Sequence, residues 1–266
     1  MRVSLIVTTY NRPDALLLVL KSIERQSTLP FEVIIADDGS NNKTLKLISN
    51  FKLRTSLKVV HSWQKDDGFR AAKSRNKAIS KSNGDYIILI DGDMILHSEF
   101  IQDHIKNVQK DCFIQGNRVL LTKQATKSSI KRMNIDFSFL SKGIKNRKNA
   151  IHSAFLSSLF SKKKNYLRGV KTCNISFFKK DCININGFNN HFEGWGREDS
   201  EFVSRLLNYG IKRKNLRFNA IQFHLWHSEN TRLSLAQNDL ILKSSISNKV
   251  VWCDDGIERY LKNDNF

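Results

Sequence analysis

The sequence predicts an α/β fold in which helices flank a mostly parallel central sheet. Apolar, β-branched segments alternate with segments of helical periodicity through residues 3–90. Strands that alternate with helices favour parallel pairing through right-handed crossovers. Polar groups follow three of these strands, at residues 9–12, 37–38 and 91–93. Because ligands of such sheets bind beyond the carboxyl ends of the strands, we expect these groups to converge on one site.

The first third of the chain supplies four predicted strands and three predicted helices. Residues 3–8 have the continuous apolar, β-branched character of a strand buried on both faces, and Pro13 suits the first turn of the helix that follows. Asn83-Gly84 indicates a turn before the last of these strands. The predicted strands are 3–8, 32–36, 57–61 and 86–90, and the predicted helices are 14–26, 44–51 and 69–80.

Beyond Cys112 the alternation becomes irregular. We expect strands at 112–121, 173–178 and 216–225 and a helix at 199–209, separated by a basic, partly mobile stretch. The pattern predicts a single domain over 1–235, divided into 1–122, a basic insertion at 123–168, and 169–235. Residues 236–266 mix Leu and Ile with Lys and Asn and are expected to form a helical tail on the core.

The composition is that of a soluble globular protein with a full core: 266 residues, 40% hydrophobic and 26% charged. No apolar run approaches the ~18 residues that span a bilayer, and the first residues lead into a strand pattern rather than a signal peptide. We therefore expect a cytoplasmic protein. Its four widely spaced cysteines form no Cys-x-x-Cys pair, which predicts reduced thiols with packing roles.

The formal net charge of +19 is compatible with nucleic acid, an anionic membrane or a phosphate-rich substrate. Much of the charge lies between Lys127 and Arg168, interleaved with apolar clusters such as residues 137–140 and 154–160. Such a segment can insert apolar side chains while its cations meet lipid phosphates. This predicts peripheral attachment to the inner face of the cytoplasmic membrane; the alternative is that the lysines only keep the protein soluble.

Gly194-Trp195-Gly196 stands just before two adjacent carboxylates, Glu198 and Asp199. The glycines allow a close backbone approach to a ligand, and the indole offers an apolar face to a pyranose ring. A carboxylate beside it can accept a hydroxyl proton. The run predicts a sugar-binding platform next to a general base, and the alternative is a turn with a packing Trp and solvated acids.

Asp91-Gly92-Asp93 follows a buried strand, so both carboxylates are expected at the sheet edge. Hard oxygen ligands suit Mg²⁺ or Mn²⁺, which in turn neutralises a diphosphate. The alternative is a simple β-turn. His224 and His227 end a predicted strand, and imidazole suits Mn²⁺, so we favour His227 as a further ligand and rank His224 below it; a structural histidine is the alternative.

Asp37-Asp38-Gly39-Ser40 is compatible with a helix-capping turn, which accounts for one acid and the serine. The second acid suggests an acceptor for a uracil N–H or a ribose hydroxyl. Arg70, Arg75 and Asn76 fall on the helix that follows the third strand, where a guanidinium can meet a diphosphate or a pyrimidine. Solvated helix charge is the alternative for both arginines.

Together these motifs carry a resemblance. Residues 7–12 (Val-Thr-Thr-Tyr-Asn-Arg), 37–40 and 91–93 resemble glycosyltransferase family 2 enzymes, which have the Rossmann-like GT-A fold. Residues 185–188 with 194–199 are similar to the carboxyl-terminal catalytic region of β-1,4-galactosyltransferases and to bacterial chondroitin-type polymerases. The match covers roughly 1–122 and 168–230.

The resemblance implies a nucleotide-sugar-binding half at 1–122 and an acceptor and catalytic half at 169–235. By it Asp93 and His227 ligate Mn²⁺ or Mg²⁺, Asp199 is the base, and Glu198 and Trp195 hold a sugar. Animal galactosyltransferases have a methionine where His224 falls, and they have a membrane anchor and disulfides that are not expected here. The residues implied to contact the UDP-sugar donor are Thr8, Thr9, Tyr10, Arg12, Asp37, Asp38, Arg70, Arg75, Asn76, Asp91, Gly92, Trp195 and Gly196.

The sequence thus predicts an inverting, metal-dependent glycosyltransferase that moves a sugar from a UDP-sugar to a glycan or lipid-linked acceptor. The expected setting is bacterial capsule, surface polysaccharide or lipopolysaccharide synthesis. The alternative is a non-catalytic basic protein that keeps the nucleotide-sugar fold and binds nucleic acid or an anionic polymer. The combination of Asp93, Glu198 and Asp199 argues against that alternative, so no nucleic-acid partner is expected.

Overall fold

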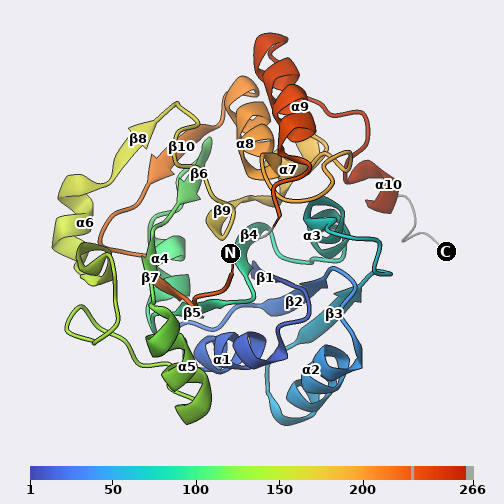
Figure 1. Ribbon diagram of the computed structural model, residues 1–266. Helices are drawn as coiled ribbons and strands as arrows, with labels where there is room; N and C mark the ends of the chain where they lie inside the picture. Colours follow the sequence, from blue (N-terminus) through green and yellow to red (C-terminus); the bar gives the residue numbers. More distant parts are fainter. Residues whose placement is uncertain (229–230, 262–266) are drawn as a thin grey trace.

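The computed structural model describes residues 1–228 and 231–261 and contains an eight-stranded sheet and a three-stranded sheet (Figure 1). The large sheet has the order β3-β2-β1-β4-β9-β6-β10-β8, and the small one β5-β11-β7. The strands are β1 (Val3–Thr9), β2 (Glu32–Asp37), β3 (Val59–Trp63), β4 (Tyr86–Asp91), β5 (Met94–Leu96), β6 (Cys112–Gln115), β7 (Arg118–Leu120), β8 (Lys162–Lys164), β9 (Asn174–Phe178), β10 (Lys212–Asn215) and β11 (Gln222–His224).

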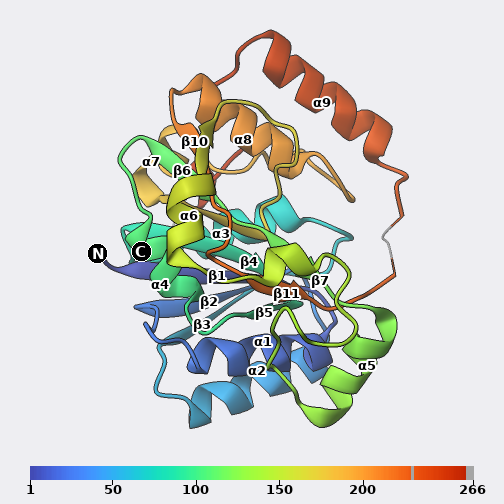
Figure 2. The ribbon, with the colours of Figure 1, turned by 90° about the vertical axis from the view of Figure 1, so that its left-hand side faces the viewer.

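Helices cover both faces of the large sheet, as Figures 1 and 2 show, with α1 and α2 on one side and α3 and α8 on the other. The helices are α1 (Pro13–Glu24), α2 (Asn42–Arg54), α3 (Ala71–Ser80), α4 (Phe100–Lys106), α5 (Lys123–Arg132), α6 (Ala154–Phe160), α7 (Lys179–Asn184), α8 (Glu198–Asn208), α9 (Leu235–Ser247) and α10 (Glu258–Leu261), with a 3-10 turn at Arg147–Ala150.

The core has two main layers because alternate residues of the central strands face opposite sides of the sheet. In β1, Leu5 and Val7 pack with α1, α2 and α4, whereas Ile6 packs with α3, α7 and α8. A third cluster lies under the small sheet, where Val119 and Phe223 meet Leu18 of α1. The predicted α/β fold with a mostly parallel central sheet is confirmed.

Direction changes at β9, and this change builds the site. Strands β3, β2, β1 and β4 are parallel, but β9 runs antiparallel to both β4 and β6. Its first residue, Asn174, therefore pairs with Ile90 near the end of β4. The segment that enters β9 lies beside Asp91 as a consequence.

Every element predicted in residues 3–90 is present, with ends that differ by no more than three residues. Two predictions beyond that point were wrong in detail. The strand expected at 112–121 is two strands in different sheets, broken where Gly116 packs so closely on Asn174 that a Cβ would lie 2.4 Å from its side chain. The strand expected at 216–225 is confined to β11.

The basic insertion predicted at 123–168 contains α5, α6 and β8, and no helix in the described part of the chain is long and apolar enough to cross a bilayer. The tail predicted at 236–266 begins with α9, which packs beside α8; residues 229–230 and 262–266 of the predicted segments lie outside the described residues. All four cysteines are buried and unpaired, as expected: Cys112, Cys173, Cys182 and Cys253.

Candidate active site

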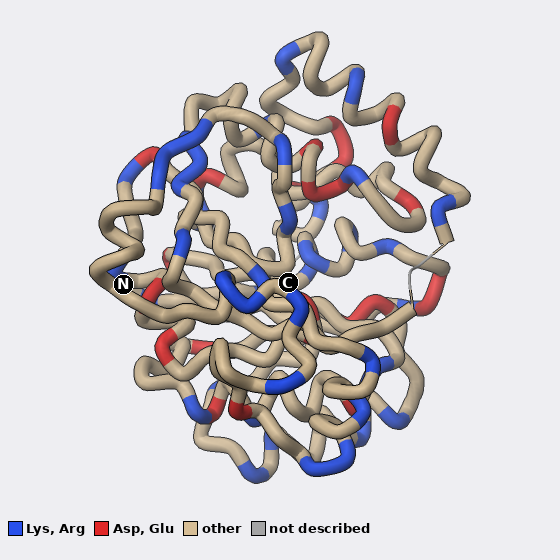
Figure 3. Tube along the Cα trace, turned by 60° about the vertical axis from the view of Figure 1, so that its left-hand side comes forward, with Lys and Arg blue, Asp and Glu red and all other residues tan. Residues whose placement is uncertain are grey.

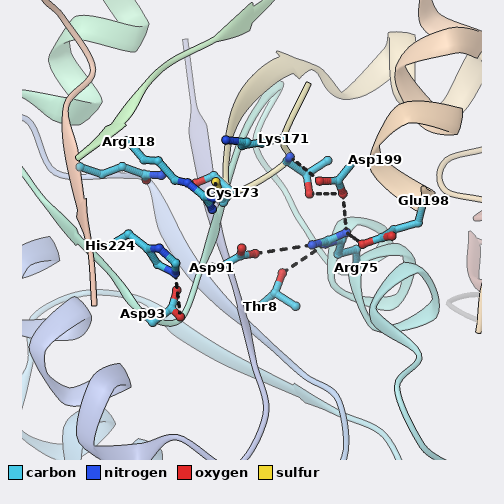
Figure 4. Close-up of polar contacts among 12 residues, drawn as sticks. Thr8, Arg75, Asp91, Asp93, Arg118, Lys171, Cys173, Glu198, Asp199 and His224 are labelled. Atoms are coloured by element: carbon cyan, nitrogen blue, oxygen red, sulfur yellow. Dashed lines mark hydrogen bonds and ion pairs between the residues drawn. The ribbon is translucent and has the colours of Figure 1, made fainter. Parts of the chain in front are cut away.

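The polar groups at the ends of β1, β2 and β4 meet at one edge of the sheet, because these strands are parallel and in register. Thr8 pairs with Asp91, and Thr9 pairs with Asp37. The N-terminus of α8 and the segment before β9 complete the edge, as Figure 4 shows. The convergence predicted from the strand ends is therefore present.

Asp93, His224 and His227 form a cluster whose ligand atoms lie within 4.8 Å of one another. The Nε2 atoms of His224 and His227 lie 3.3 and 3.4 Å from Asp93 Oδ2. The pairing of β11 with β5 brings His224 opposite Met94, and Leu225 N donates to the Asp93 carbonyl. These main-chain bonds fix the cluster from the backbone.

The cluster fits a divalent cation. Asp93 Oδ1 is buried and has no hydrogen-bond partner in the described structure, which is costly for a carboxylate oxygen unless a ligand satisfies it. His227 Nδ1 lies 2.6 Å from the Ser228 carbonyl, so this nitrogen carries the proton and Nε2 keeps a lone pair for a metal. Burial alone would raise the pKa of Asp93, but the hydrogen bond and charge of His224 and the charge of His227 lower it overall.

Asp91 lies at the same sheet edge, as expected, but outside this cluster. Its side chain points toward Arg75, 3.5 Å away, while Asp93 lies beyond the turn at Gly92 (Figure 4). Gly92 is packed tightly there, since a Cβ would lie 3.0 Å from the Thr8 carbonyl oxygen. Burial raises the pKa of Asp91 to about 6, although the charge of Arg75 opposes the rise.

Arg75 of α3 is the hub of the second half of the site. Its guanidinium lies 3.1 Å from Asp199, 3.4 Å from Glu198 and 3.5 Å from Asp91, and its Nε donates to Thr8 Oγ1 over 3.4 Å. The side chain is 5% exposed, so the alternative of a solvated helix charge is wrong. Because three carboxylates surround the guanidinium, its donors are directed at the protein rather than at open space for a diphosphate.

Asp199 is held at the start of α8 by the segment that enters β9. Thr172 N donates to Asp199 Oδ2 over 2.9 Å and Thr172 Oγ1 donates to Oδ1 over 2.5 Å, while Arg75 also binds Oδ1. A carboxylate oxygen has two lone-pair positions, so Oδ2 retains one open acceptor position. Asp199 is therefore held in one orientation and can accept one more hydrogen bond at Oδ2.

Glu198 precedes Asp199 and is more deeply placed, with a side chain that is 10% exposed. Burial and then the neighbouring charge of Asp199 raise the pKa of Glu198, while Arg75 lowers it. The turn before α8 needs left-handed backbone at Gly194, Gly196 and Arg197. The glycines that the sequence placed around Trp195 therefore serve this turn.

The Trp195 loop is clamped by the tail helix. Asn238 of α9 is buried and its Nδ2 donates to the carbonyls of Glu193 and Gly196, at 3.0 and 2.9 Å. The indole is 41% exposed, and the Arg232 guanidinium lies 5.7 Å from its ring centroid. An exposed indole next to the carboxylates is consistent with the predicted sugar platform, which stays a prediction.

On the donor side, the Asp38 carboxylate has acceptor positions that the hydrogen bonds of the fold leave open. It is buried and accepts from Arg70 N at 2.8 Å and Gln64 Nε2 at 2.6 Å, and burial raises its pKa to about 6. Thr9 Oγ1 is buried nearby without a hydrogen-bond partner in the described structure. Tyr10 is exposed, and its hydroxyl donates to Asp66.

Arg12 and Arg70, on the donor side of the site, already form ion pairs within the protein. Arg12 precedes α1 and lies 3.4 Å from Asp14, and the Arg70 guanidinium lies 3.0 Å from Glu193, next to the Trp195 loop. Both side chains keep some exposure, at 31% and 19%. They remain candidates for donor contacts.

Two residues predicted as donor contacts have polar atoms that already bind groups within the protein. Asp37 is fully buried and accepts from Ser40 N and His61 Nε2, which is the turn-capping role considered as its alternative. Asn76 is fully buried, and its amide binds both the N–H and the carbonyl of Phe188 and also Asn190. Asn76 therefore anchors the loop before the Trp195 turn.

Sequence reasoning missed Arg118, Lys171, Thr172 and Cys173, which Figure 4 or the hydrogen bonds place beside the carboxylates. The signal available in the sequence was a polar pair, Lys171-Thr172, directly before a predicted strand. It is informative only when that strand is known to run antiparallel, because only then does its beginning meet the end of β4.

Two family models match the chain. The family model described as glycosyl transferase family 2 matches residues 4–167, and one described as the N-terminal domain of galactosyltransferase matches residues 154–228. Hyaluronan synthase of Pasteurella multocida is 29% identical over 227 residues, and chondroitin synthase of Escherichia coli is 25% identical over 227 residues. Each alignment covers 78% of this chain but only 23% and 32% of those proteins, so the chain spans less than a third of their length.

Solved structures share the fold. Staphylococcus aureus TarS 1–349 matches with a TM-score of 0.64 and 17% identity, covering 98% of this chain and 68% of that one. A mannosyltransferase from Pyrobaculum calidifontis, solved with GDP-Man and Mn²⁺, matches with a TM-score of 0.63 and 14% identity, covering 99% and 68%. Sequence motifs, fold and family model agree: the chain belongs to glycosyltransferase family 2 and is a glycosyltransferase with the GT-A fold.

Proposed function

We propose that the protein is an inverting, metal-dependent transferase that moves a sugar from a UDP-sugar to a hydroxyl of a glycan or lipid-linked acceptor. The observation that carries this proposal is the pairing, at one sheet edge, of the Asp93–His224–His227 cluster with an oriented carboxylate, Asp199. TarS has been solved in complex with UDP and with UDP-GlcNAc, which supports a uridine nucleotide here. The occurrence of this cluster together with the oriented carboxylate supports a catalytic protein over the non-catalytic basic protein considered as the alternative.

On the leaving-group side, Asp93, His224 and His227 would hold Mn²⁺ or Mg²⁺, whose positive charge stabilises the departing diphosphate when it is bound. Thr9 and Asp38 are the donor contacts with buried polar atoms facing this edge, and Asp38 is the candidate acceptor for a ribose or uracil donor group. Tyr10, Arg12 and Arg70 complete the proposed nucleotide surface.

On the acceptor side, Asp199 Oδ2 takes the proton of the attacking hydroxyl at its open acceptor position. Thr172 and Arg75 hold the carboxylate while the hydroxyl oxygen attacks the anomeric carbon from the face opposite UDP. A single displacement of this kind inverts the anomeric configuration. Glu198, whose pKa is raised by burial to about 7, and the exposed ring of Trp195 are proposed to hold the sugars.

The proposed setting is bacterial capsule, surface polysaccharide or lipopolysaccharide synthesis at the cytoplasmic face of the membrane. Lys and Arg predominate along the chain (Figure 3), and residues 127–168 carry eleven of them against a single acid, Asp136, so this stretch contributes +10 of the net +19. Phe155 and Leu159 of α6 are 72% and 57% exposed, and Leu140 is 73% exposed. Exposed apolar side chains among cations support peripheral attachment to anionic lipid.

The test is UDP release from a panel of UDP-sugars, with Mn²⁺ and with chelator, in the presence of glycan acceptors. The proposal predicts release from at least one UDP-sugar with Mn²⁺ and a loss of release with chelator. Release that is equally fast in chelator would contradict the metal-dependent mechanism.

A further inference from the structure

Arg118 and Lys171 form a second cationic group beside the carboxylates. They line a cavity of about 130 Å³ whose other walls include Gln115, Asn146 and Cys173. Figure 4 shows the two side chains entering from opposite sides and pointing toward one another near Cys173. Within residues 1–228 and 231–261, no carboxylate forms an ion pair with either side chain, and the Arg118 guanidinium contacts Cys173 Sγ at 3.9 Å.

The backbone that carries these cations is pinned, although the cations are not. Asn146 and Asn149 both donate to the Arg118 carbonyl, at 2.8 and 3.2 Å. Gln115 binds both main-chain groups of Lys171, accepting from its N–H at 3.2 Å and donating to its carbonyl at 2.8 Å. The amides of the pocket thus fix the main chain at Arg118 and Lys171 and leave the charged ends of the two side chains for a ligand.

The two like charges repel. Burial and then the charge of Arg118 lower the pKa of Lys171. An anion between the two heads would relieve this repulsion and accept charge-assisted hydrogen bonds. The cavity is large enough for a carboxylate or phosphate group, since a water molecule needs only about 10–15 Å³ by the same measure.

The position of the pocket relates it to the reaction. Lys171 immediately precedes Thr172, which binds Asp199, and Arg118 lies on β7 beside the strand that ends at His224. We propose that this pocket binds an anionic group, a carboxylate or a phosphate, carried by a sugar substrate. The inference rests on the proposed function and narrows its substrate class to a charged sugar, whether donor or acceptor.

The test uses the full chain and the double variant Arg118→Gln with Lys171→Gln, which keeps side chains of polar character. The matched control is Lys52→Gln with Arg54→Gln at the exposed end of α2, which removes the same two charges elsewhere. Thermal unfolding of both variants near the wild-type midpoint establishes that they fold.

The first measurement is calorimetric binding of UDP with Mn²⁺, expected to be unchanged in both variants. The second measurement compares binding affinities. Glucuronate and inorganic phosphate are compared with glucose as acceptor-side probes, and UDP-glucuronate is compared with UDP-glucose as donor-side probes. We expect the wild type and control to prefer the charged member of one arm by roughly tenfold or more, and the pocket variant to lose that preference. The arm that shows it identifies the charged substrate.

The inference is overturned when wild type shows no charge preference in either arm, or when the pocket variant retains it. It is also overturned when the pocket variant loses UDP affinity, because the cations then serve the diphosphate. Failure of the wild type to bind UDP at all contradicts the proposed function instead. The preference for glucuronate or phosphate over glucose is measured without UDP, so it tests the pocket whatever the result with UDP.

Discussion

Replacing Arg75 by Met should destabilise the protein in a pH-dependent manner. The substitution fills the space with an apolar side chain but leaves Asp91, Glu198 and Asp199 facing one another without their common cation. Breaking a buried ion pair by removing one partner costs about 3–5 kcal/mol. Asp91 and Asp199 keep 35% and 25% exposure, so we expect the lower end, about 3 kcal/mol at neutral pH.

The sign of the pH dependence follows from the pKa values. The pKa of Asp91 is raised to about 6, so the stability that its protonated form contributes is present at low pH and is lost as pH rises through about 6. The pKa of Glu198 is shifted in the same direction. Arg75 lowers both, so in Arg75→Met the two pKa values rise further, and the deficit relative to wild type should grow from pH 5 to pH 8.

Urea unfolding at pH 5, 7 and 8 measures the deficit. The control is Arg2→Met, which removes an arginine whose ion pair with Asp85 is 57% exposed on both sides and which should change stability by less than about 1 kcal/mol. A deficit no larger than that of the control, or one that is greatest at pH 5, would refute the view of Arg75 as a counterion for buried carboxylates.

Three further predictions concern catalysis and location. Asp199→Asn should leave UDP affinity intact and slow transfer by roughly a hundredfold or more, as loss of a general base does; near-normal transfer would remove Asp199 from the mechanism. Thr172→Val should lower kcat by about tenfold without changing Mn²⁺-dependent UDP affinity, and Thr172→Ser should restore kcat, whereas a purely structural role would give equal effects of both. The protein should co-sediment with anionic but not neutral vesicles at low salt, and Phe155→Ser with Leu159→Ser should weaken this; equal, negligible binding to both vesicles would return residues 127–168 to a solubilising role.

The sequence predicts the part of the site that is built from the ends of parallel strands. Asp38, Asp91 and Asp93 each follow an apolar strand, and the carboxyl ends of parallel strands share one edge, so their convergence is readable from local patterns. Their individual partners are not. The Asp37 carboxylate binds His61 on another strand, and the Asn76 amide binds Phe188, which is 112 residues away.

The missed residues lie where non-local pairing decides the fold. Thr172 and Lys171 reach the site only because β9 is inserted antiparallel between β4 and β6, and no local pattern specifies those partners. Strand β10 reads Lys-Arg-Lys-Asn, which lacks the apolar alternation of a strand, and its buried Arg213 donates to carbonyls of the loop before β9. Likewise, Asp93 is held by a bond from Leu225 N, just after β11, to its carbonyl, a pairing that no local pattern specifies.

The central claim is that Asp93, His224 and His227 hold a cation that binds the nucleotide diphosphate. Calorimetric titration of UDP into the wild type, with Mn²⁺ and again with chelator, tests it most directly, with Asp93→Ala and His227→Ala alongside. The account predicts binding in Mn²⁺ that chelator abolishes and that both variants weaken by roughly tenfold or more. Equal UDP affinity in Mn²⁺ and in chelator for the wild type would contradict it.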